Sequence, residues 1–181
     1  MNHLHDAHVA VWANIHDARQ HRFHISTWVR HNAGRLAQRQ KASGFKFAAL
    51  HEYTDAYGSP IFWRIRLKSE AGEKWIRPMR RCGDEQFDLG QPDFPDGTPL
   101  YRLDQLSNQD DARVWVVEGE SCVDALVDFG LTATTSGGAD SAARADWQPL
   151  AGRDVTIWPD NDDAGARYAN VVQDKLRALG C

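Results

Sequence analysis

Two hydrophobic stretches of this chain run directly into carboxylate residues, and this feature limits the folds open to it. The first, residues 113–117, is followed by Glu118, and the second, residues 154–158, leads to Asp160 and Asp162. A continuous apolar run of this length is typical of a strand covered on both faces. Because parallel sheets open their ligand crevices at the carboxyl ends of the strands, we expect the three acidic groups to share one crevice.

The segment around these points alternates strand and helix, which predicts a parallel sheet flanked by helices. The expected elements are strands at 113–117, 131–135 and 154–158, and helices at 121–129, 140–147 and 164–179. A helix stop is expected at Gly130. A glycine turn at Gly137 and Gly138, after the second strand, would let the backbone approach a ligand closely.

The acidic groups suit a hard divalent cation. Mg²⁺ prefers oxygen ligands and usually takes one or two protein carboxylates, leaving the other positions to water and phosphate oxygens. In an extended segment Asp160 and Asp162 point to the same side and can share one ion. An ordinary helix cap is the alternative for this Asp-rich stretch, and Asp163 is expected to begin the following helix.

These residues resemble a Toprim domain, the catalytic module of bacterial primases, type IA and type II topoisomerases and some nucleases. The matching features are a strand ending in Glu118-Gly119, the Gly137-Gly138 turn, and a strand ending in Asp160-Asn161-Asp162 before Ala164-Gly165. The wider pattern, with Glu120, Asp124-Ala125-Leu126 and residues 147–153, is similar to the primase-helicase proteins of phages, plasmids and integrated elements. The resemblance covers about residues 59–181 and is strongest after Arg113.

The resemblance implies a division of roles. Glu118 would act as a general acid or base in nucleotidyl transfer, and Asp160 and Asp162 would hold Mg²⁺, for which Mn²⁺ substitutes. The residues that could add outer-shell contacts are Glu120, Asp124, Asp163, Gly137 and Gly138. The implied partners are single-stranded DNA, nucleotides and a replicative helicase domain or protein.

The sequence departs from the family pattern in two places. Many primases carry a zinc ribbon, but Cys82, Cys122 and Cys181 are isolated, so no zinc site is expected. A Toprim sheet normally gains another strand after the helix that follows Asp-x-Asp, whereas this sequence stops there. We therefore expect a Toprim domain at 113–181 that is shortened at its C-terminal end.

Charge divides the chain into a basic and an acidic half. Residues 1–81 hold 14 Lys and Arg against 6 Asp and Glu, and residues 82–181 hold 7 against 19. Basic groups that hold a phosphate backbone beside an acidic metal site are what a nucleic-acid enzyme requires. A solvated charged face is the alternative.

The basic half is expected to contain an antiparallel β-meander at 49–90, with strands at 51–56, 61–68 and 74–80 joined by turn sequences. Alternation places Arg64, Arg66 and Lys68 on one face. The predicted nucleic-acid-binding residues are these three with Lys74, Arg77, Arg80 and Arg81, and Trp63 and Trp75 could stack on bases. Residues 1–48 form a basic helical region, with helices expected at 6–18 and 26–40, and residues 91–112 form a linker.

The sequence contains no run of ~20 apolar residues and no secretion signal at its start, so no membrane span and a cytoplasmic location are expected. The leading functional hypothesis is a DNA primase core or fragment that makes RNA primers on single-stranded DNA. A Toprim nuclease would use the same carboxylates, and a non-catalytic nucleic-acid-binding remnant is the third possibility. A topoisomerase is disfavoured because the chain has no room for the domain that carries the nucleophilic tyrosine.

Overall fold

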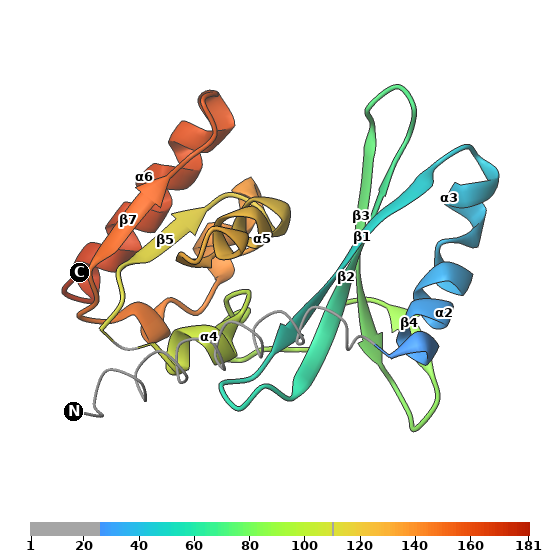
Figure 1. The fold of residues 1–181 in the computed structure, drawn as a ribbon, viewed down its shortest axis with the longest axis horizontal. Helices are drawn as coiled ribbons and strands as arrows, with labels where there is room; N and C mark the ends of the chain where they lie inside the picture. Colours follow the sequence, from blue (N-terminus) through green and yellow to red (C-terminus); the bar gives the residue numbers. More distant parts are fainter. Residues whose placement is uncertain (1–25, 110) are drawn as a thin grey trace, which may run out of the picture.

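The computed structural model describes residues 26–109 and 111–181. An antiparallel four-strand sheet is followed by a three-strand parallel sheet interleaved with helices (Figure 1). This architecture confirms the fold class that the sequence predicts. The helix predicted at 6–18 lies outside the described residues. No helix in the part of the chain that the structure describes combines the length and apolar character that a membrane span requires.

The antiparallel sheet has the strand order β1-β2-β3-β4. Its strands are β1 (Lys46–Thr54), β2 (Pro60–Lys68), β3 (Lys74–Arg81) and β4 (Phe87–Leu89). The first three confirm the predicted meander, and β4, with only three residues, was not predicted. The β1–β2 turn is closed by the Asp55 carboxylate, which accepts hydrogen bonds from the backbone N–H groups of Tyr57 and Ser59, both at 2.9 Å.

Two helices cover the face of this sheet that is turned away from the parallel sheet (Figure 1). The single helix predicted at 26–40 is instead divided into α2 (Thr27–Leu36) and α3 (Gln38–Ala42), because Ala37 leaves the helical conformation, with ψ near 3°. Ser26 caps α2 by accepting a hydrogen bond from the Val29 N–H at 3.2 Å. The core beneath the helices consists of Val29, Ala33, Ala37, Leu50, Trp63, Ile65, Leu67, Met79 and Phe87.

The parallel sheet has β5 in its centre, between β6 and β7. Its strands and helices are β5 (Val114–Val117), α5 (Glu120–Asp128), β6 (Thr132–Thr134), β7 (Val155–Trp158) and α6 (Asp163–Ala178). The short helix predicted at 140–147 is two 3₁₀ helices, η1 (Ala139–Arg144) and η2 (Gln148–Leu150). Helix α6 covers one face of the sheet and buries Tyr168, Val172 and Leu176 against Val114 and Val116.

The segment between the sheets is packed into the molecule. It contains α4 (Leu103–Ser107) and buries Leu100, Tyr101 and Leu106. The backbone of Thr98 also exchanges hydrogen bonds with residues 144 and 146, each at 2.9 Å. The predicted linker therefore contributes to the core.

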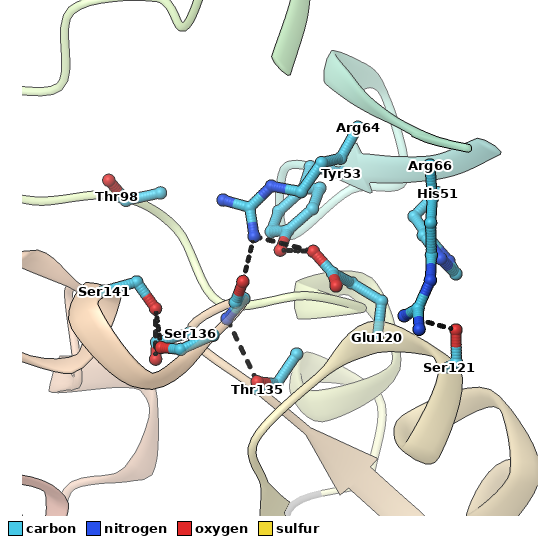
Figure 2. Close-up of polar contacts among 12 residues, drawn as sticks. His51, Tyr53, Arg64, Arg66, Thr98, Glu120, Ser121, Thr135, Ser136 and Ser141 are labelled. Carbon is cyan, nitrogen blue, oxygen red and sulfur yellow. Dashed lines mark hydrogen bonds and ion pairs between the residues drawn. The ribbon is translucent and has the colours of Figure 1, made fainter. Parts of the chain in front are cut away.

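A third hydrophobic cluster joins the two sheets. Tyr53 and Phe62 of the antiparallel sheet pack with Val117, Val123 and Ala133 of the α/β region. A buried polar link lies beside them: the Arg64 Nη1 is 2.7 Å from the Glu120 Oε1, and the Tyr53 hydroxyl donates to the same oxygen at 2.8 Å (Figure 2). Arg64 also donates to the carbonyl of Gly137. One guanidinium group thus ties β2 to α5 and to the turn after β6.

Removing Arg64 should destabilise the protein because Glu120 would keep a buried charge without its partner. Arg64→Met is expected to lower the free energy of unfolding by about 3–5 kcal/mol in urea denaturation. The matched control is Arg66→Met, two residues along the same face and partly exposed, which should change it by less than about 1 kcal/mol. Equal effects of the two substitutions would contradict a special role for the buried pair.

Candidate metal centre

Three carboxylates lie at the adjacent ends of β5 and β7. Glu118 follows β5 directly, and Asp160 and Asp162 follow β7, whose last residue Trp158 is in register with Val117. Burial and the neighbouring charges of Asp160 and Asp162 raise the pKa of Glu118 above its ordinary value, while Lys74 opposes the shift. The structure therefore brings together the three acidic residues that the sequence singles out.

The Glu118 carboxylate has an oxygen suited to an added ligand. Its Oε2 is buried and has no hydrogen-bond partner among the described residues. Burying a charged oxygen without a partner is costly, so a cation or a proton at this position would stabilise it. Asp160 and Asp162 are exposed beside it.

Residues 26–109 and 111–181 contain no preformed group of three or more His, Cys, Asp or Glu side chains arranged to hold a metal ion. Mg²⁺ does not require such a cage, since it commonly keeps several waters and binds through one or two carboxylates plus substrate phosphates. Together with the unpartnered Glu118 oxygen, the exposed aspartates fit an ion of this kind.

Asp162 also caps helix α6. Its Oδ1 accepts a hydrogen bond from the Gly165 N–H at 2.7 Å, and Asp163 is the first helical residue, as predicted. A Cβ at position 165 would overlap the carbonyl oxygen of Asp160, so glycine is required for this close approach. The cap and the glycine fix the loop between β7 and α6. The helix-cap interpretation and a metal role for Asp162 are compatible because its second carboxylate oxygen is not used in the cap.

Two of the predicted outer-shell residues point away from the carboxylate cluster. Glu120 binds Arg64 and Tyr53 at the junction of the sheets. Asp124 accepts hydrogen bonds from the Arg102 Nε and the Tyr101 hydroxyl, both at 3.1 Å, and lies 3.2 Å from the His51 Nδ1. Both carboxylates instead hold α5 against the antiparallel sheet and the segment between the sheets.

The glycine turn after β6 is fixed by Arg64. Gly137 has a φ of 99°, and a Cβ there would overlap the Arg64 guanidinium. Gly138, with a φ of 141°, leads into η1, whose Asp140 is among the carboxylates that raise the pKa of Glu118. Gly137 thus allows a close approach by Arg64, where the sequence predicted an approach by a ligand.

The predicted basic residues divide between two faces of the antiparallel sheet. Arg64, Arg66 and Lys68 share one face, as expected, and the β2–β3 register adds Lys74 and Arg80 to it and places Arg77 and Arg81 on the other. Arg64 is buried in its ion pair and so does not take the exposed position expected for a phosphate contact. Arg77 lies over Trp75, and Arg81 over Trp28 and Phe87.

Arg66 and Lys74 lie on the face of the antiparallel sheet that carries Arg64. Partial burial and the charge of Asp160 raise the pKa of Cys122, on the first turn of α5, while Arg66 and Lys74 oppose the rise and Glu118 adds to it. Arg66 also donates to the Ser121 hydroxyl at 3.1 Å. Neither Arg66 nor Lys74 forms an ion pair within the described residues. We call this set of residues, the two cations and the three carboxylates, the acidic–basic cleft.

A second recess has mixed charge. A groove of about 690 Å³ runs between residues 91–98 and η1. Its cations, Arg144 and Lys175 with the buried Arg64, are accompanied by Asp93 and Asp96. None of the three carboxylates after β5 and β7 lines this groove, so it is separate from the candidate metal centre.

Several residues of the site could not be recognised from the sequence. Tyr53 and His51 carry no motif, and their roles depend on contacts across the two sheets. Trp63, considered as a stacking residue, is buried and donates to Glu52 at 2.7 Å. Trp158 is exposed beside Asp160 and was not singled out.

Comparison of the chain with protein-family models, with curated proteins and with solved structures gives no significant match.

The stability of the protein should depend on the ionisation of Asp124. Burial raises its pKa, but the hydrogen bond from His51 and the charge of Arg102 outweigh this and lower it to about 2. Because its pKa is lowered in the folded protein, the Asp124 carboxylate adds to the free energy of unfolding at pH values above the ordinary Asp pKa of about 4. This contribution is lost as the pH falls from about 4 to 2. Asp124→Asn should lower the free energy of unfolding by about 1–2 kcal/mol at pH 6. This value takes into account that Asp124 is partly exposed to solvent.

Urea denaturation at pH 6, 4 and 2 would test this expectation. The variant should show a smaller loss of stability between pH 4 and 2 than the parent. Asp111→Asn, at an exposed position, is the matched control and should follow the parent. Parallel curves for Asp124→Asn and the parent would show that Asp124 makes no such contribution.

Proposed function

We propose that this chain is a Toprim-type, Mg²⁺-dependent nucleic-acid enzyme and, within that class, the catalytic part of a DNA primase that makes RNA primers on single-stranded DNA. The observation that carries the proposal is the acidic–basic cleft, in which Glu118, Asp160 and Asp162 follow the adjacent ends of β5 and β7, and Arg66 and Lys74 share the sheet face of Arg64. The parallel β6-β5-β7 order, with its acidic groups at the carboxyl ends, supports the Toprim assignment.

The carboxylates would divide the chemistry. Asp160 and Asp162 would hold Mg²⁺, which when bound neutralises charge on phosphate oxygens during an in-line displacement. Glu118 would accept the proton of the primer 3′-hydroxyl as its oxygen attacks the α-phosphorus of a nucleoside triphosphate and the bond to pyrophosphate breaks. A partly buried carboxyl with a raised pKa suits this role, since an effective general base has a pKa nearer the working pH.

The cations would hold the nucleic acid. Arg66 and Lys74 lie across the cleft from the carboxylates, and Lys68 and Arg80 are exposed on the same face of the antiparallel sheet. Phosphate groups on this face would be held beside the metal site by charge alone. Arg64 would act indirectly, by fixing the position of this face against α5.

An activity assay tests the function. The protein, a single-stranded template, labelled ribonucleotides and Mg²⁺ should yield new oligomers, and Glu118→Gln should reduce the yield by ~10²-fold while leaving Mn²⁺ affinity within a few-fold. The control Glu85→Gln, at an exposed position, should retain activity. Shortened template would instead indicate a nuclease, and neither product would indicate a binding module that works with other components.

The metal site should be lost when both aspartates are neutralised. Asp160→Asn with Asp162→Asn removes two anionic ligands, while asparagine at position 162 preserves the helix cap. Calorimetric titration with Mn²⁺ should show at least a roughly tenfold loss of affinity, with circular dichroism unchanged. Asp174→Asn, at an exposed position later in α6, is the matched control. Unchanged Mn²⁺ affinity in the double variant would place the site elsewhere.

The salt dependence of strand binding should identify the basic side of the cleft. Replacing Arg66 and Lys74 by Gln should weaken binding of oligothymidylate and reduce the slope of log K against log salt by roughly 0.7 per lost phosphate contact. The matched pair Arg77→Gln and Arg81→Gln lies on the opposite face of the same sheet and should leave the slope unchanged. Equal slopes for the two double variants would show that Arg66 and Lys74 are solvated surface charges that make no specific phosphate contact.

A further inference from the structure

Trp158 is an exposed aromatic residue at the edge of the proposed metal site. It ends β7, two residues before Asp160, and 56% of its surface is exposed. Single exposed apolar side chains are common, so exposure alone assigns Trp158 no role. What distinguishes it from the other exposed large apolar side chains of the described residues is its position beside the proposed metal site. Phe129 and Tyr57 are more exposed still, but both lie in turns outside the cleft.

The sheet register fixes the direction of the indole. Trp158 is in register with Val117, and Trp115 lies two residues before Val117, so all three side chains emerge on one face. That face is turned toward the antiparallel sheet, because Val117 and Trp115 belong to the cluster that joins the sheets. The alternate residues Val155 and Ile157 pack toward α6 on the other face. Trp158 thus lies on the same side of the sheet as the acidic–basic cleft.

Trp158 is exposed because of its place in the sheet. Strand β7 is at the edge of the β6-β5-β7 sheet, and α5 packs on β5 and β6. The indole is supported from one side by Trp115, with ring centroids 5.6 Å apart and planes inclined at 56°. A supported ring with an open surface can stack on a flat partner at a small cost in side-chain entropy.

We propose that Trp158 is the stacking platform for a nucleobase at the metal centre, and this rests on the proposed function. The occupant follows from the chemistry at this end of the sheet: Asp160 and Asp162, which follow the ring in sequence, would hold a metal-bound phosphate, and Arg66 and Lys74 on the antiparallel sheet would hold backbone phosphates. A ligand that presents phosphates to both groups and a flat apolar surface to the indole is a nucleotide. Such stacking is tolerant of sequence, because every base has a π-face.

The test compares strands that differ only in their bases. Fluorescence anisotropy would measure the affinity of the full chain for labelled oligothymidylate and for an abasic strand of equal length, each with Mg²⁺. Trp158→Ala should weaken oligothymidylate binding by ~5- to 100-fold, the range expected for one stacked base, and change abasic binding by less than about twofold. Trp158→Phe should recover part of the loss. Phe129→Ala, at an exposed ring outside the cleft, is the matched control.

A third ligand, a free ribonucleoside triphosphate, distinguishes the source of the base. If Trp158→Ala loses affinity for the triphosphate alone, Trp158 stacks on the base of the incoming nucleotide. If it loses affinity for oligothymidylate alone, Trp158 stacks on a base of the template. Either result supports the proposal. Equal losses for oligothymidylate and the abasic strand would overturn it, because Trp158 would then only support the Asp160 loop. A fall in sedimenting mass for Trp158→Ala, with unchanged ligand binding, would overturn it in favour of contact with a second copy.

The stacking proposal can be wrong while the proposed function is right, and the experiments distinguish the two cases. If Trp158→Ala binds every ligand like the parent while neutralising Asp160 and Asp162 still removes Mn²⁺ binding, the platform is wrong and the metal-dependent function stands. If the parent binds neither strand nor triphosphate, both are wrong.

Discussion

The arrangement of this protein depends on the buried ion pair between Arg64 and Glu120. Arg64 comes from the antiparallel sheet, Glu120 from the first turn of α5, and the same guanidinium reaches the carbonyl of Gly137 after β6. Three elements distant in sequence are thus held at one point, as Figure 2 shows. A buried pair of this kind adds little net stability, because desolvation offsets most of the attraction. Its value lies in orientation, since any other alignment of the two sheets would leave a buried charge without a partner.

The position of the cleft follows from that alignment. Arg66 is two residues from Arg64 on the same strand face, and Glu118 is two residues from Glu120. Fixing this pair also brings Arg66 to the first turn of α5, where it donates to the Ser121 hydroxyl, and Lys74 close enough to Glu118 to oppose the rise of its pKa. The second link, from Asp124 to His51 and Arg102, holds the other end of the contact. In this arrangement the structural carboxylates are satisfied by the protein, and Glu118 keeps an oxygen without a partner among the described residues.

Much of this fold could be predicted from local patterns. Apolar runs ending in carboxylates predicted β5 and β7, and turn sequences predicted the β1-β2-β3 meander, because both signals lie within a few residues. The roles of Arg64, Glu120 and Asp124 could not be predicted in the same way. Alternation assigned Arg64 to a face of its strand but could not reveal that α5 covers that face. Trp158 was overlooked for a related reason: its exposure depends on β7 being the edge strand of the described sheet.

The central claim is that the carboxylates after β5 and β7 form one divalent-metal site. The most direct measurement is anomalous diffraction from crystals soaked in Mn²⁺, which locates the ion without relying on activity. The account predicts a peak within about 2.0–2.3 Å of a carboxylate oxygen of Asp160 or Asp162, with the Glu118 carboxylate beside the ion and reached through a water. A strong peak on other residues, with none between these strand ends at saturating Mn²⁺, would contradict it.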